Sequence, residues 1–116
     1  MACMKFLLIG RDIGFTTPVA PGQLAGLLEG VYIPSFQALE QWEKEGKATG
    51  GFLAAQRAGA MILEAASAEE LSSKMTSLPF WGLLNWEVIP LQTFRSGIED
   101  AQRQVSTLKQ MVSMQH

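Results

Sequence analysis

Residues Gly50–Glu70, with the sequence GGFLAAQRAGAMILEAASAEE, decide the fold of this chain. Two short apolar runs, 50–55 and 58–65, predict two strands, and the polar stretch Gln56–Gly59 predicts the hairpin turn that joins them. Ser67–Glu70 follows at once and has the S-x-x-E form of a helix capping box. The stretch therefore predicts strand, strand and helix in direct succession.

Helices are predicted on either side of this hairpin. Before it, between Pro21 and Gly46, one helical face recurs every three or four positions and consists of Leu24, Leu28, Val31, Ser35, Ala38 and Trp42. Pro34 lies inside this face and has no backbone donor, so we expect the helix to kink or restart there. After the capping box the helical spacing continues to Leu78, and Pro79 ends the second helix.

Two more strands flank the helices. The apolar run Met4–Gly10 predicts the first, and Leu84–Leu91 predicts the last. In the last strand, Trp86 and Val88 face one side, whereas Asn85, Glu87 and Ile89 face the other. The resulting order is β-α-β-β-α-β, which is the split βαβ arrangement of a four-stranded antiparallel sheet with two helices on one face. The chain is therefore predicted to be of the α+β class.

A terminal helix over residues 94–112 follows this core. Its apolar residues recur every three or four positions and are Phe94, Ile98, Ala101, Val105, Leu108 and Met111 or Val112. The length of 116 residues fits a single domain, 1–116, with a core over 4–91. Loop composition predicts an irregular connection over Phe15–Gly22.

Composition excludes several classes of function. Lys and Arg number 9 against 11 Asp and Glu, so we expect no nucleic-acid partner. No apolar run approaches the ~18 residues of a membrane span. Cys3 and His116 are the only cysteine and histidine, so we expect neither a disulfide nor a metal site, and a reducing, cytoplasmic setting.

The helix-free face of the predicted sheet is also apolar. Leu7 and Ile9 alternate with Phe6 and Leu8, so both sides of the first strand favour burial. Only 17% of the residues are charged, which is low for a small domain and favours a surface covered by a partner. Two sheets that pair face to face would bury this surface and enclose a barrel-like cavity. We therefore expect a homodimer or a higher homo-oligomer.

The segment Leu78–Leu91, with the sequence LPFWGLLNWEVIPL, resembles the C-terminal strand region of muconolactone isomerase and its relatives. Met4–Leu8 and Met61–Leu71 fit the same template in order, so the resemblance covers roughly residues 4 to 91. It implies ferredoxin-like subunits that pair into a dimeric α/β barrel. It also implies cofactor-independent isomerisation of a small unsaturated lactone, which needs a general base and a group that stabilises an enolate.

The resemblance points to two acids as catalytic candidates, Glu87 and Glu64. Asn85 and Arg11 are candidates for holding the substrate in the inter-subunit cavity, where Glu87 would be desolvated and suited to act as a base. Three aromatic residues are further substrate-binding candidates, namely Tyr32, Trp42 and Trp81. For each of these residues a structural role is the alternative. Glu87 could form an ion pair with Arg11 or Arg57 or lie exposed at the rim, and Glu64 could be a solvated side chain at a strand end. The arginines could lie on the surface, and the aromatic residues could pack in the core or at an interface.

Two other functions remain open. A related dimeric-barrel monooxygenase could act on an aromatic compound, although the chain lacks an internal histidine for haem. A non-catalytic dimer could bind a small organic ligand or a partner protein. The first strand favours this second alternative, because Leu7 and Ile9 stand where the isomerases carry polar residues. The sequence thus predicts a small-molecule site without a cofactor, and leaves open whether the protein is an enzyme.

Overall fold

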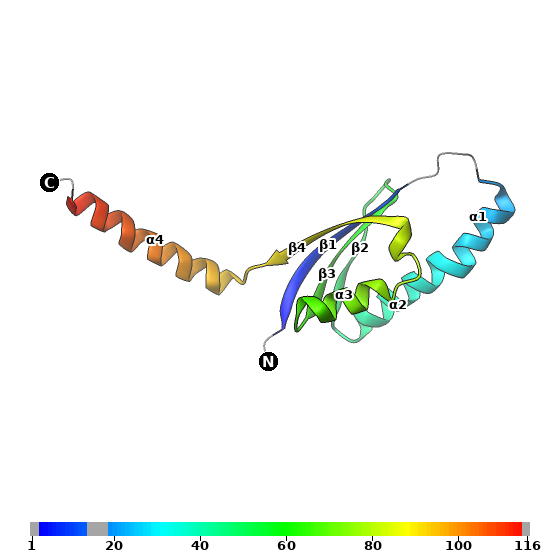
Figure 1. The fold of residues 1–116 in the computed structure, drawn as a ribbon, viewed down its shortest axis with the longest axis horizontal. Helices are drawn as coiled ribbons and strands as arrows, with labels where there is room; N and C mark the ends of the chain where they lie inside the picture. The colour runs from blue at the N-terminus through cyan, green and yellow to red at the C-terminus, as the bar shows by residue number, and fades with distance from the viewer. Residues whose placement is uncertain (1–2, 14–18, 115–116) are drawn as a thin grey trace.

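The computed structural model describes residues 3–13 and 19–114 (Figure 1). Residues 15–18 of the loop predicted over Phe15–Gly22, and His116, lie outside the described residues. The elements, in chain order, are β1 (Met4–Asp12), α1 (Pro21–Leu27), the π-helical turn η1 (Leu28–Tyr32), α2 (Ile33–Lys44), β2 (Ala48–Phe52), β3 (Ala58–Ala65), α3 (Ala68–Thr76), the 3₁₀ turn η2 (Trp81–Leu83), β4 (Leu84–Leu91) and α4 (Phe94–Met114).

The four strands form one antiparallel sheet in the order β2-β3-β1-β4. β1 lies in the middle, between β3 and β4, so the two βαβ halves interlock as the predicted β-α-β-β-α-β order requires. The α+β class, the four-stranded antiparallel sheet and the C-terminal helix are thereby confirmed. The arrangement is ferredoxin-like.

One face of the sheet carries the core. Side chains alternate along β1, so that Phe6 and Leu8 point toward the helices and are 5% and 0% exposed. α2 and α3 lie on this same side of the sheet (Figure 1). The buried core residues are Phe6, Leu8, Met61, Leu63, Ala65, Leu71, Met75, Leu78 and Phe80.

The opposite face of the sheet has no helix over it in the described structure. It presents Leu7, Ile9 and Ile62, which are half-buried, and Ile89, which is 38% exposed. We call this surface the helix-free face. Its apolar character agrees with the sequence prediction.

The expected break at Pro34 is confirmed as a π-helical turn. The N–H of Ile33 donates to the carbonyl of Leu28, five residues back instead of four. Pro34 cannot donate a backbone hydrogen bond, and the wider turn directly before it lets the chain continue as α2. The helix from Pro21 to Lys44 is therefore continuous in direction but not in hydrogen-bond pattern, and Gly46, with φ of 75°, follows its end.

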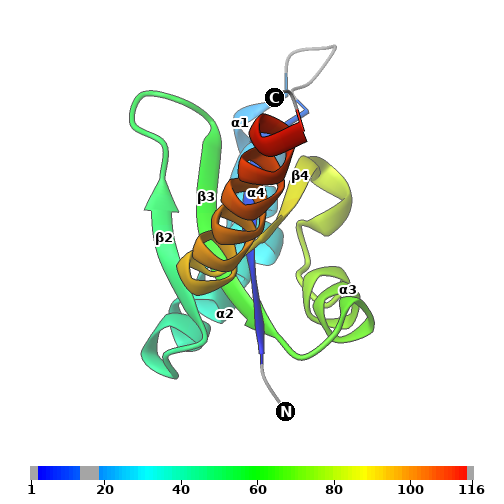
Figure 2. The same cartoon turned by 90° about the vertical axis from the view of Figure 1, so that its left-hand side faces the viewer.

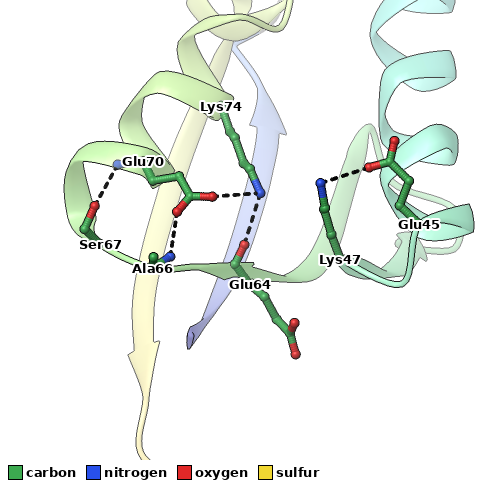
Figure 3. Close-up of polar contacts among 7 residues, drawn as sticks. All are labelled: Glu45, Lys47, Glu64, Ala66, Ser67, Glu70 and Lys74. Carbon is green, nitrogen blue, oxygen red and sulfur yellow. Dashed lines mark hydrogen bonds and ion pairs between the residues drawn. The ribbon is translucent and has the colours of Figure 1, made fainter. Parts of the chain in front are cut away.

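The capping box before α3 is confirmed with one difference. The Ser67 hydroxyl accepts from the Glu70 N–H at 3.1 Å, as expected. The Glu70 carboxylate reaches back one residue further than in the usual box and accepts from the Ala66 N–H at 2.8 Å (Figure 3). Lys74 also lies beside Glu70 at 3.4 Å, and these contacts hold the pKa of Glu70 below its ordinary value.

The predicted hairpin and its second strand, 58–65, are confirmed, but the predicted bounds of the turn, 56–59, are wrong. β2 ends at Phe52 and β3 already begins at Ala58, so the turn spans residues 53–57. Backbone bonds from Leu53 N–H to the Ala58 carbonyl and from Gln56 N–H to the Leu53 carbonyl close it. Ala55 adopts a φ of 59° in this turn, a conformation that sequence rules assign to Gly or Asn, so the sequence carried no signal for it.

Ser35 connects α2 to the segment before β4. It is 0% exposed; its hydroxyl donates to the Val31 carbonyl at 2.7 Å and accepts from the Phe80 N–H at 3.1 Å. We expect Ser35→Ala to lower the free energy of unfolding by about 2 kcal/mol, because the Phe80 N–H would lose its acceptor in a dry site. Chemical denaturation measures this loss, and the exposed Ser72→Ala serves as the control. An equal, small effect of both variants would contradict the role of Ser35.

α4 projects away from the rest of the molecule (Figure 1). The radius of gyration is 20.4 Å, whereas a globular chain of this length has about 13 Å. None of the 21 residues of α4 is buried in the described structure. Within residues 3–13 and 19–114, no helix has the length and apolar content needed to cross a membrane.

Candidate functional site

The two predicted catalytic acids lie on the helix-free face but not together. In the strand register, Glu87 is opposite Ile9 and Glu64 is opposite Lys5, so they are four residues apart along β1. At ~3.4 Å per residue this separates them by about 14 Å along the strands, and β1 lies between them as well. The structure therefore does not assemble Glu87 and Glu64 into one pair of carboxylates within a chain.

Glu64 is part of a surface charge pair. Its carboxylate lies 4.0 Å from the Lys5 ammonium group and its side chain is 40% exposed. Its backbone carbonyl accepts from Lys74 at 3.4 Å, while the carboxylate points away from Lys74 (Figure 3). These contacts agree with the structural alternative for Glu64.

Three predicted residues do come together at the other end of the helix-free face. Arg11 pairs with Asn85 in the β1–β4 register, and Glu87 lies two residues further along β4 on the same face. Arg11 donates to the Gln56 side chain at 3.1 Å on the exposed surface. Arg11, Asn85 and Glu87 thus form a polar cluster that is open to solvent within one chain.

The three aromatic candidates lie on the opposite, helix-covered side of the sheet. Trp42 packs against the core, and Trp81 stacks on Trp86 with 5.6 Å between ring centroids. The Trp81 carbonyl also accepts from the Trp86 indole N–H at 3.1 Å. These contacts agree with packing roles for Trp42 and Trp81, and only Tyr32 lines a cavity.

That cavity has a volume of about 610 Å³ and lies between the α1–α2 helix and the sheet. We call it the helix–sheet cavity. This volume is typical of small-molecule sites, which are mostly apolar with a few fixed polar groups. The apolar lining comes from the helix residues Leu24, Leu28, Phe36 and Leu39, from the sheet residues Leu8, Phe52, Met61, Leu84 and Trp86, and from Phe80 directly before η2.

Four glycines on the strands line the cavity, namely Gly10, Gly50, Gly51 and Gly59. Trp86 lies directly over Gly10, where an added Cβ would come within 2.7 Å of the indole ring. At Gly50 an added Cβ would come within 2.1 Å of the Ala60 carbonyl oxygen. Gly10 and Gly50 therefore let the Trp86 ring and the neighbouring strand approach closely beside the cavity.

Asp12, Tyr32 and Arg57 supply polar groups to the cavity lining. The Asp12 side chain is only 14% exposed, and its carboxylate lies 3.9 Å from the Arg57 guanidinium. The Asp12 N–H also donates to the Arg57 carbonyl at 2.9 Å, which fixes the two residues relative to each other. A carboxylate, a phenol and a guanidinium are thus grouped at a mostly apolar cavity.

Burial raises the pKa of the Tyr32 phenol, and the negative charge of Asp12 raises it further, while Arg57 acts in the opposite direction. Tyr32 therefore stays protonated at neutral pH and can donate a hydrogen bond to an oxygen of a bound molecule. Asp12 can accept a proton or a hydrogen bond. Together they provide an acceptor and a donor at one site.

Sequence reasoning did not single out Asp12 and placed Arg57 on the surface. A signal for Asp12 was present, because it has the same parity along β1 as Phe6, Leu8 and Gly10 and so belongs to the core-facing side. Arg57 is 74% exposed, as expected for a turn, but the altered turn brings it to Asp12. Among the described residues, no group of three or more His, Cys, Asp or Glu is arranged to hold a metal ion.

A pH titration checks the environment of Tyr32. Tyr32 is the only tyrosine, so the ultraviolet absorbance of the phenolate reports this side chain alone. We expect its midpoint in the folded protein to lie above that in the denatured chain, which should be about 10. Because the folded state binds this proton more tightly, the stability that Tyr32 contributes is complete below that pH and is lost as pH rises through the folded pKa. Equal midpoints would show that the phenol is not buried.

No protein-family model and no curated protein matches the chain.

Proposed function

We propose that the protein binds a small, largely apolar carbonyl compound in the helix–sheet cavity and transfers a proton on it without a cofactor. The observation that supports this most is the grouping of Asp12, Tyr32 and Arg57 at a cavity of about 610 Å³. The resemblance to muconolactone isomerases supports the same reaction class and favours an unsaturated lactone. The proposal differs from the sequence-based one in its site, which lies within one chain.

The proposed step is an allylic proton shift. The Asp12 carboxylate takes a proton from the carbon beside the substrate carbonyl, and the electron pair of that C–H bond forms the enolate. Tyr32 donates a hydrogen bond to the enolate oxygen, where negative charge develops. Asp12 then returns the proton to the γ-carbon, so the double bond moves and no net proton is gained or lost. The exposed Arg57 guanidinium is placed to pair with a substrate carboxylate.

A second part of the proposal concerns assembly. The half-buried residues Leu7, Ile9 and Ile62 on the helix-free face support a homodimer in which two such faces pack together. In that dimer Glu87, Arg11 and Asn85 would line an inter-subunit chamber. They form the alternative catalytic site, with Glu87 as its base.

Ligand binding tests the location of the site. With 2-naphthol as an aromatic probe, calorimetry should show binding to the protein. Leu28→Trp, which places a larger side chain at the cavity lining, should weaken it by about tenfold or more. Gln23→Trp, an exposed change on the same helix outside the lining, should leave it unchanged. Equal affinities for all three proteins would contradict binding in the helix–sheet cavity.

Proton exchange tests the chemistry. With α-angelica lactone, a small unsaturated lactone, in deuterated water, NMR should show catalysed deuterium incorporation. Asp12→Asn should slow it by about 100-fold or more, and Tyr32→Phe by a smaller factor. Glu87→Gln should retain the wild-type rate. Loss of exchange in Glu87→Gln but not in Asp12→Asn would move the site to the helix-free face. Binding of the lactone without catalysed exchange would show that the protein binds a ligand but does not catalyse the proposed reaction.

A further inference from the structure

α4 carries an apolar stripe that nothing covers in the described structure. Ile98, Val105, Leu108 and Val112 are 48%, 49%, 58% and 57% exposed. Apolar surface in water costs about 25 cal/mol per Å², so four large side chains in one row favour an occupant. The occupant can be inferred from the spacing and charges of α4.

The stripe follows a strict period of 3.5 residues. Phe94, Ile98, Ala101, Val105, Leu108 and Val112 alternate steps of four and three, which places them at successive d and a positions of a heptad. The flanking e and g positions are Arg95, Gly97, Gln102, Gln104, Lys109 and Met111, of which only Met111 is large and apolar. A narrow seam of this kind is typical of a coiled coil, whereas a helix that packs on a sheet needs a wider apolar face.

We propose that α4 forms a parallel, two-stranded coiled coil with α4 of a second copy of this chain. The side chains along the seam support two strands. All three a positions are β-branched, namely Ile98, Val105 and Val112, and the last of the three d positions, between Val105 and Val112, is Leu108; the other two d positions are Phe94 and Ala101. β-branched residues at a with Leu at d favour parallel dimers over larger bundles.

The flanking charges set the direction. In an antiparallel pair the e positions of the two helices face each other, so Arg95 would lie beside the partner subunit's Lys109, twice by symmetry. In a parallel pair each g position faces the next e position, which brings Gln104 beside the partner subunit's Lys109. Only the antiparallel arrangement places like charges together, so the charge pattern favours the parallel one.

The start of α4 follows the sheet after a short, hydrogen-bonded linker. Two residues, Gln92 and Thr93, separate it from β4. The Thr93 hydroxyl accepts from the Ser96 N–H at 3.1 Å, and the Gln92 amide donates to the Ser96 hydroxyl at 2.8 Å. Figure 2, which views the molecule from the α4 end, shows the helix in front of the sheet. A parallel pair of helices therefore holds both sheets at the same end of the assembly.

Sedimentation equilibrium of the full chain tests the pairing. We expect a dimer whose dissociation constant rises about 100-fold or more in the double variant Val105→Glu/Leu108→Glu. The control Ser106→Glu/Thr107→Glu adds the same charges outside the seam and should change the dissociation constant little. A monomeric wild-type chain, or a seam variant that dimerises like the wild type, would overturn the proposal. Since α4 has no buried residues, the seam variant should retain the Tyr32 titration of the folded core.

Disulfide trapping tests the direction. In a Cys3→Ser background, Val112→Cys at an a position should form a disulfide-linked dimer under mild oxidation, because parallel helices bring equal a positions together. The adjacent Ser113→Cys, at a b position, should not. Linkage of Val112→Cys chains only to Phe94→Cys chains would show an antiparallel pair and overturn the proposed direction.

Discussion

Leu63→Ala should lower the free energy of unfolding by about 2–5 kcal/mol, the range for removing a large aliphatic side chain from a core. Leu63 is 0% exposed, lies in β3 and points toward the helices, where it belongs to the buried core. Chemical denaturation measures the loss. The mutation leaves the helix-free face unchanged.

Ile62→Ala is the matched control, because Ile62 directly precedes Leu63 on the same strand and points to the other face. Its side chain is only half-buried in one chain, so the loss should stay below about 2 kcal/mol for the monomer. In the proposed dimer Ile62→Ala should also weaken self-association, which Leu63→Ala should not. A larger loss of monomer stability for Ile62→Ala than for Leu63→Ala would contradict the assignment of the two faces.

Gly10→Val should lower the free energy of unfolding by about 3 kcal/mol. A Cβ at this position would come within 2.7 Å of the Trp86 ring, so Trp86 would have to leave its place beside Trp81 and Phe80. Loss of the near-ultraviolet circular dichroism of the stacked indoles should accompany the loss of stability. Valine itself suits a strand, so the effect would arise from the contact and not from backbone preference.

Gly51→Val is the control for this change. Gly51 is also in a strand of the sheet, and an added Cβ there would meet no atom within 4 Å. The same substitution should therefore leave stability unchanged or raise it slightly. If both variants were equally stable, Trp86 would not pack on Gly10 as described.

The succession of strands and helices and the two faces of the sheet could be predicted from the sequence, because they depend on local signals: hydrophobic period, turn residues and a helix cap. Alternation in β1 and β4 correctly separated Trp86 and Val88 from Glu87 and Asn85. The break at Pro34 was predictable for the same kind of reason, since a missing backbone donor acts locally. The Ser67 cap was predictable because its signal lies within four residues.

The site was harder to predict because it depends on contacts between distant residues. Asp12 and Arg57 meet only because the β2–β3 turn closes at 53–57, and that turn depends on Ala55 in a conformation alanine rarely adopts. Ser35 was correctly placed on the helix face that packs inward, but its bond to Phe80 spans 45 residues. The helix–sheet cavity itself is lined by residues from a helix and from separate strands, which no local pattern connects.

The location of a bound ligand tests the central claim most directly. In a methyl NMR titration with 2-naphthol, shifts should be largest at Met61 and Leu28, which line the helix–sheet cavity. Ile62 and Ile89, on the helix-free face, should change little. Shifts confined to Ile62 and Ile89, with Met61 and Leu28 unaffected, would contradict the account and place the ligand on the other side of the sheet.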